Sequence, residues 1–181
     1  MATLEELEKR IQILEDVEAI RKLKARYGQL VDARFDSSGM LKSGEELKSI
    51  ASKIVELFTE DAVWDRGKEQ GILSGRRELY DHFRQPGYDF HAHYFLNAYI
   101  APEGNKARAR WYLWMPGTMG GGTAFWLAAV IDDEYAKING QWLFTYVKSS
   151  IFFLTPYDQG WAKQKLPGVR DLGHQRNAVK F

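Results

Sequence analysis

The spacing of apolar residues changes partway along the chain, and this change limits the folds that are possible. From Leu4 to Leu30, apolar side chains recur every three or four residues, as on one face of an α-helix. From Phe90 onward, runs of strand-forming residues alternate with turn sequences instead. Helices followed by strands predict an α+β fold, in which about three helices cover a single antiparallel sheet.

Three helices are expected before most of the sheet. The first spans residues 3 to about 33 and begins at Thr3, because a glutamate three positions later completes a capping box. A break is expected near Asp16, where the spacing of apolar residues changes, and the first stretch is expected to pack on a partner subunit. Ser43 is the predicted N-cap of the second helix, and the third covers residues 76–83.

Five strands are expected, at residues 61–65, 90–100, 107–115, 123–136 and 141–153. The Asn139-Gly140 pair between the last two is a strong hairpin signal, so neighbouring strands should pair antiparallel. From about Thr155 the chain is rich in polar residues, glycine and proline, and we expect a tail that wraps the body or a neighbour. The length of 181 residues fits a single domain, residues 1–181.

The composition excludes several classes of protein. The 25 basic and 24 acidic residues give a net charge of +1 without long blocks of like charge, which argues against a nucleic-acid partner. Without cysteine, the sequence has no disulfides or thiolate metal sites. The longest apolar run, residues 124–131, is too short to cross a bilayer, and the charged N-terminus is unlike a signal peptide. A soluble, cytoplasmic protein without a membrane partner is expected.

A pair of histidines carries the strongest chemical signal. Because alternate side chains of a strand share a face, His91 and His93 are expected side by side, and His93 is a candidate general base with Asn97 beside it as a hydrogen-bond donor. The alternative is that both histidines are exposed or bonded to the backbone. The residues expected on this face are Asp89, His91, His93, Phe95, Asn97 and Tyr99.

A metal site is the competing interpretation of the same segment. Asp89, His91 and His93 have the spacing of a facial triad, because their side chains would project together. No His-Glu-x-x-His or similar signature accompanies them, so a site without metal is expected.

The end of the first helix offers a partner for His93. Asp32 follows two apolar residues and is expected where the helix meets the sheet, so an inward carboxylate needs a partner that offsets its desolvation. A carboxylate bonded to an imidazole fixes the tautomer of the ring and stabilises the imidazolium. Tyr27, five residues earlier, would flank the same pocket. A surface aspartate and a core tyrosine are the alternative.

Several short sequences occur in the order seen in one known family. With them, and over nearly the whole chain, the sequence resembles the SnoaL-like branch of the NTF2-like superfamily. The resemblance implies a cone of curved antiparallel sheet closed by helices, assembled as a homodimer or homotrimer. The sequences are LFTEDAVWD at residues 57–65, Gly71, Gly75-Arg76, His93 with Asn97, DDEYAKINGQW at residues 132–142 and TPYDQGW at residues 155–161.

Within that branch, the pattern is most similar to two groups of cofactorless lyases, the bile-acid 7α-dehydratases and the hexachlorocyclohexane dehydrochlorinases. The resemblance places the catalytic tyrosine, aspartate and histidine of the dehydratases on Tyr27, Asp32 and His93. Both groups also carry an arginine on the last strand, where the comparable positions of this chain are the apolar Val147 and Ile151.

Substrate-binding side chains are expected around these three residues. Lys148 is the cation nearest to the missing arginine, and aromatic residues, at 14% of the chain, are abundant enough to line a pocket. The expected substrate is therefore a small hydrophobic or aromatic molecule. The expected substrate-binding residues are Asn97, His91, Trp64, Tyr99, Trp114 and Lys148.

The expected function is that of a lyase without cofactor or metal. His93, held by Asp32, would remove a proton from a hydroxylated substrate, and Tyr27 would donate a hydrogen bond to the leaving oxygen or to an oxyanion. Water or formaldehyde would leave. The alternatives are an enzyme that releases formaldehyde from lignin-derived diarylpropanes, an isomerase or cyclase of the same fold, and a ligand-binding module without catalysis.

Overall fold

The structure, a computed structural model, describes residues 2–68 and 70–163. The capping box predicted at Thr3 and the N-cap predicted at Ser43 are both present: each side chain accepts a hydrogen bond from the backbone amide three residues later, and the glutamate there accepts one from the backbone amide of the capping residue. The helices therefore begin where the sequence predicts. They are α1 (Leu4–Asp32), α2 (Gly44–Val55) and α3 (Gly75–Phe83).

The predicted break of the first helix near Asp16 is wrong, because α1 runs without interruption. Asp16 is buried, and its carboxylate accepts hydrogen bonds from the Lys137 ammonium at 2.7 Å and from the Trp142 indole at 2.9 Å. A paired charge thus occupies a core-facing position of the helix, which explains why the apolar spacing changes there.

The strands form one seven-stranded sheet in the order β2-β1-β7-β6-β5-β3, and β4 also pairs with β5. β5, β6 and β7 are antiparallel neighbours, as predicted. The expectation of an entirely antiparallel sheet is wrong, because β1 runs parallel to β7; their long connection does not impose the direction that a hairpin would. The strands are β1 (Phe58–Asp65), β2 (Ile72–Ser74), β3 (Phe90–His91), β4 (Tyr94–Glu103), β5 (Lys106–Met119), β6 (Thr123–Ile138) and β7 (Gln141–Pro156).

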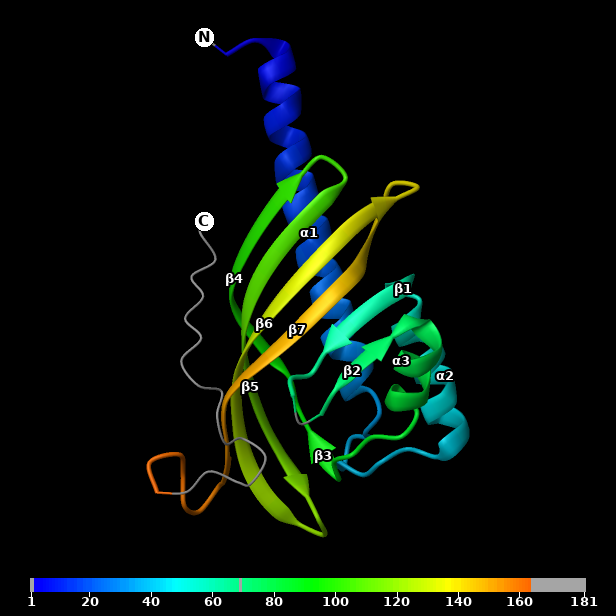
Figure 1. The fold of residues 1–181 in the computed structure, drawn as a ribbon, viewed down its shortest axis with the longest axis vertical. Helices are drawn as coiled ribbons and strands as arrows, with labels where there is room; N and C mark the ends of the chain where they lie inside the picture. Colours follow the sequence, from blue (N-terminus) through cyan, green and yellow to red (C-terminus); the bar gives the residue numbers. More distant parts are fainter. Residues whose placement is uncertain (1, 69, 164–181) are drawn as a thin grey trace.

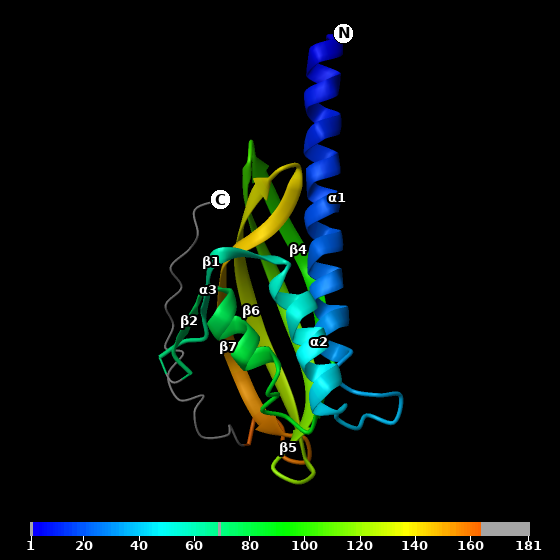
Figure 2. The ribbon, with the colours of Figure 1, turned by 90° about the vertical axis from the view of Figure 1, so that its right-hand side faces the viewer.

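The sheet curls into a half-barrel, and the helices gather on one side of it (Figures 1 and 2). α1 packs against β4 and β7, α2 packs against α1 and α3, and α3 packs against β1. Apolar side chains fill the space between these layers, including Ile20, Tyr27, Phe58, Phe83 and Phe144. The α+β cone predicted from the sequence is confirmed.

The N-terminal half of α1 projects beyond the sheet (Figure 2). The apolar side chains of this part, from Leu4 to Leu14, are exposed. At the other end of the chain, the tail predicted from about Thr155 falls mostly on residues 164–181, which lie outside the described residues. Within the described ranges, no helix combines the length and the apolar content that a membrane span needs.

The strand predicted at residues 90–100 is two strands with a gap between them. β3 ends at His91, and Ala92 and His93 belong to neither strand. Within β4 the register shifts after Leu96, and Asn97 adopts a positive φ of 49°. Such a bulge inserts a residue into the ladder, so the side chains beyond it change face.

Candidate active site

A cavity of about 340 Å³ lies between the helices and the sheet. Its volume is within the range of small-molecule sites. The wall is largely apolar, and the polar side chains in it come from α1, α3, β1 and β7, from the segments that follow α1 and β1, and from the segment around the β3–β4 gap. Apolar side chains from the helices and strands that line it include Phe83, Phe95, Leu113, Met115, Leu127 and Val147.

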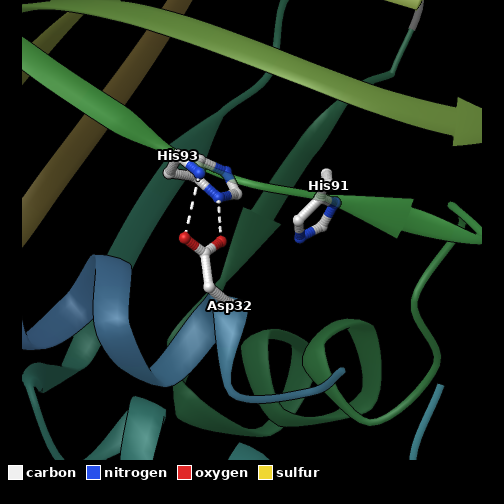
Figure 3. Close-up of side chains that lie close together, drawn as sticks. All are labelled: Asp32, His91 and His93. Carbon is white, nitrogen blue, oxygen red and sulfur yellow. Dashed lines mark hydrogen bonds and ion pairs between the residues drawn. The ribbon is translucent and has the colours of Figure 1, made fainter. Parts of the chain in front are cut away.

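His93 lines this cavity, and its ring contacts Asp32, as the sequence indicated (Figure 3). One Asp32 oxygen lies 2.7 Å from Nδ1 of the His93 ring, and the other accepts a hydrogen bond from the His93 backbone amide at 2.9 Å. The His93 side chain is 12% exposed and that of Asp32 is 31% exposed. With the carboxylate accepting from Nδ1, the neutral ring keeps its free lone pair on Nε2.

The His91 ring packs beside His93, with 4.7 Å between the ring centroids. Nη2 of Arg34 lies 2.9 Å from Nε2 of His91, and because a guanidinium only donates, this nitrogen must accept. Burial, together with the charges of His93 and Arg34, lowers the pKa of His91 to about 2. His91 is therefore a neutral ring whose proton sits on Nδ1, and this buried Nδ1 has no partner among the described residues.

Tyr27 is buried in the cavity wall within an aromatic cluster that includes Phe58 and Phe95. Burial raises the pKa of its hydroxyl well above the usual range, an effect that the charge of Arg34 partly opposes. Tyr27 thus stays protonated at neutral pH and is suited to donating a hydrogen bond rather than to accepting a proton.

Three cationic side chains that the sequence analysis did not select also line the cavity. Lys24 is 1% exposed and forms an ion pair with Asp133 at 2.8 Å; burial lowers the pKa of the lysine and raises that of the aspartate. Arg34 and Arg66 are the other two. Lys24 follows Ile20 by four positions and so lies on the buried face of α1. This spacing could have predicted an inward-facing cation, whereas we find no such signal for the two arginines.

Two of the predicted binding residues on β4 lie outside the cavity, contrary to expectation. Phe95 pairs with Leu113 and faces inward, but after the bulge Tyr99 pairs with Arg110 on the outer face. Asn97, at the bulge itself, is exposed. The simple alternation that predicted one continuous face fails because the bulge reverses it.

Trp114 and Lys148 also do not line the cavity, although the sequence predicted both as substrate-binding residues. Trp114 stacks on Trp126, with 5.0 Å between the ring centroids, on the face of β5 opposite Leu113. Lys148 is exposed on β7. Trp64, in contrast, lines the cavity, and its indole donates a hydrogen bond to Ser149 at 3.0 Å.

The potential metal-binding group differs from the one expected. Asp32, His91 and His93 each offer a ligand atom, and these atoms lie within 4.8 Å of one another. Asp89 instead accepts a hydrogen bond from the backbone of Gly121 at 2.9 Å. The bonds from Arg34 to His91 and between His93 and Asp32 would have to rearrange for a metal to use all three side chains.

Comparison with known proteins agrees with the fold. The model of the SnoaL-like domain matches residues 49–148, which is more than half of the chain. This chain belongs to the SnoaL-like domain family. The family lies in the NTF2-like superfamily, as the sequence resemblance implied. No curated protein matches the sequence.

Several solved structures share the fold. An NTF2-like protein with a cystatin-like fold from Novosphingobium aromaticivorans is 24% identical, covering 90% of this chain and 96% of that one with a TM-score of 0.64. A hexachlorocyclohexane dehydrochlorinase from Novosphingobium barchaimii is 20% identical, with coverages of 79% and 90% and a TM-score of 0.65. A provisionally named scytalone dehydratase from N. aromaticivorans is 16% identical, with coverages of 86% and 95% and a TM-score of 0.65. At these identities the likeness establishes the fold alone.

Proposed function

We propose that this chain is a cofactor-independent lyase acting on a hydroxylated, hydrophobic, aromatic substrate. The observation that carries the proposal is the contact of Asp32 with His93 at the edge of an apolar cavity, which leaves Nε2 of His93 as the free base. Two solved structures of the same fold carry lyase names, a dehydrochlorinase and a dehydratase, which supports this reaction class.

His93 both takes and returns the proton in this scheme. In a dehydration, Nε2 takes a proton from carbon, the electron pair forms the new C=C bond, and the departing hydroxide takes the proton back from the imidazolium and leaves as water. In a formaldehyde release, Nε2 takes the hydroxyl proton, C=O forms as the C–C bond breaks, and the electron pair left on carbon takes the proton. The Asp32 carboxylate stabilises the imidazolium formed in either case.

Hydrogen-bond donors beside the base support the negative charge that develops on the substrate. Tyr27 keeps its proton and donates from its hydroxyl, and the partnerless Nδ1 of His91 is a second donor. Trp64 and Phe95 offer flat apolar surfaces to an aromatic ring.

The test is a screen without added cofactor, in the presence and absence of a chelator. Hydroxylated aromatic and sterol-like alcohols are incubated with the protein, and formation of conjugated alkenes or formaldehyde is followed. We expect His93→Ala to lower the rate by about 100- to 10,000-fold while retaining the wild-type circular dichroism spectrum. Lys148→Ala, on the outer face, serves as the control and should leave the rate unchanged.

Three outcomes would contradict the proposal. They are substrate binding without turnover, full activity in His93→Ala, and loss of activity on chelation that added metal restores. The first would identify a ligand-binding module of the same fold, and the third would identify Asp32, His91 and His93 as metal ligands.

A further inference from the structure

The charges around the cavity do not balance. Lys24 is paired with Asp133, and the Asp32 carboxylate supports the charge of Arg34. Among residues 2–68 and 70–163, Arg66 has neither kind of support: its hydrogen bonds there are to the Gln70 carbonyl oxygen and to Nδ1 of His82, and burial lowers its pKa. The part of the wall that the structure describes therefore contains a cation without a carboxylate partner.

The neighbouring histidines neither cancel nor add to this charge. Burial, followed by the charges of Arg66 and Arg34, lowers the pKa of His82 to about 4, and that of His91 is lowered to about 2. Both rings are neutral at physiological pH. Counting only the described residues of the wall, the excess positive charge thus belongs to Arg66.

Two side-chain nitrogens of residues that line the cavity lack partners among the described residues. They are Nε of Arg66 and Nδ1 of His91, a side chain that is only 3% exposed. The guanidinium nitrogen is always a donor, and the contact from Arg34 makes the imidazole nitrogen a donor as well. Buried donors are normally bonded, so a ligand that supplies acceptor atoms would complete this wall.

We propose that the cavity binds its substrate as an organic monoanion, an aromatic carboxylate whose charged group is held by Arg66. This inference rests on the proposed function only because the proposed reaction and the carboxylate site share this cavity. The guanidinium lies over the ring of Trp64, 6.0 Å from the centroid, and this holds it in place at the wall. The apolar side chains of the cavity then receive the aromatic body of the ligand.

Cinnamate and cinnamamide test this, because they have nearly the same shape and differ by one charge. We expect calorimetry or NMR titration to show that cinnamate binds at least about tenfold more tightly at low salt. Arg66→Gln should remove this preference and leave cinnamamide binding unchanged, and Arg66→Lys should retain part of it. Arg108→Gln is the control, since the Arg108 side chain is 78% exposed.

Equal affinity for the two ligands, no binding of cinnamate, or a preference that survives in Arg66→Gln would overturn the proposal. Binding is measured without turnover, so His93→Ala separates the lyase mechanism from anion binding by Arg66. A variant that has lost activity but still prefers cinnamate supports both proposals. A preference for cinnamate in a protein whose turnover does not need His93 would remove only the lyase mechanism.

A second inference comes from the projecting end of α1. Leu4, Leu7, Ile11 and Leu14 are separated by three, four and three residues and are between 43% and 73% exposed. This spacing is that of positions a and d over two heptads of a coiled coil, with leucine at both d positions. The apolar stripe is thus built to pack against another helix.

The stripe faces away from the body of its own chain. At about 100° per residue, the positions of the stripe lie roughly opposite those of Ile20, Tyr27 and Val31, which are buried against the sheet. The expectation of a single apolar face along the whole helix is therefore wrong. The sheet of the same chain therefore does not cover it. A second helix placed on it would have its own body on the far side, so the two bodies would not collide.

The flanking charges favour a second copy of α1 running parallel. Glu8 and Glu15 are at position e, and Arg10 is at position g. In a parallel pair, Arg10 of each chain lies beside Glu15 of the other. In an antiparallel pair, Arg10 would lie beside Arg10 and Glu8 beside Glu8, which is repulsive. We infer that the chain forms a two-fold homodimer through the N-terminal half of α1.

Sedimentation over a range of concentrations tests the dimer. We expect the wild type to reach twice the chain mass of 20.9 kDa and Leu7→Lys/Leu14→Lys to stay at that mass. Ile138→Lys, at another exposed apolar position, should dimerise as the wild type does. Arg10→Glu should weaken the dimer, and adding Glu15→Arg should restore it.

A wild type that remains monomeric or forms trimers would overturn the inference, as would a dimer that survives Leu7→Lys/Leu14→Lys. Failure of Glu15→Arg to restore the dimer would overturn the parallel orientation.

Discussion

Asp32→Asn tests whether the carboxylate sets the tautomer of His93. The asparagine amide has one accepting oxygen and one donating nitrogen, whereas two N–H groups of His93 converge on Asp32 at 2.7 and 2.9 Å. The backbone amide cannot change its role, so it takes the oxygen. The NH₂ group then faces Nδ1, which must accept, and the ring proton moves to Nε2. The proposed base loses its lone pair.

The size of the effect follows from the bonds that change. A hydrogen bond to a charged group is replaced by one between neutral groups, so the free energy of unfolding should fall by about 1 kcal/mol. The rate should fall by roughly 100- to 10,000-fold, because the base is in the wrong tautomer and its imidazolium has lost the neighbouring negative charge. The protein should remain folded.

Long-range ¹H–¹⁵N NMR correlations identify the protonated nitrogen directly and need no substrate. We expect Nδ1–H in the wild type and Nε2–H in Asp32→Asn, with urea unfolding giving the change in stability. Asp81→Asn, whose carboxylate forms an exposed pair on α3, is the control and should change neither. A variant with the Nδ1–H tautomer and the wild-type rate would refute the reasoning.

Three further predictions concern stability. The pKa of His82 is about 4 in the folded protein and 6.5 ordinarily, so the unfolded chain binds the proton first as the pH falls. The free energy of unfolding should therefore drop by about 3 kcal/mol, starting below pH 6.5 and complete below pH 4. Urea titrations at several pH values should show that His82→Gln removes this drop. Lys24→Met leaves the buried Asp133 unpaired and should cost about 3–5 kcal/mol by urea unfolding, and adding Asp133→Asn should recover most of it. A Cβ at Gly117 would lie 2.6 Å from the Phe90 carbonyl oxygen, so Gly117→Ala should lower the thermal midpoint and cost about 1–3 kcal/mol.

The sequence predicted the elements well where local signals decide them. The capping boxes located the starts of α1 and α2, and the Asn139-Gly140 turn located the β6–β7 hairpin. It did not predict the parallel pairing of β1 with β7, because that contact joins segments far apart in the chain and has no turn to mark it. The bulge at Asn97 was missed for a related reason, since its position depends on how β4 pairs with β5.

The candidate site was predictable where one residue implied a partner. An aspartate at the inner end of a helix needed a donor, and His93 supplied it. The arginines were not found, because Arg34 and Arg66 lie next to element ends, where sequence spacing does not say which way a side chain points. Lys148 and Trp114 were assigned from strand position and residue type, and the alternation of the strands places both on the outer face.

The two contacts of Asp32 also restrict how His93 can move. One contact holds the backbone beside the gap between β3 and β4, and the other holds the ring. Turning the ring breaks the second contact, and shifting the main chain breaks the first. The conformational entropy of His93 is therefore lost once, when the protein folds, and not again each time a ligand arrives. A molecule that enters the cavity meets a ring that is already held in place, so in the proposed reaction less ordering would be left for the proton transfer.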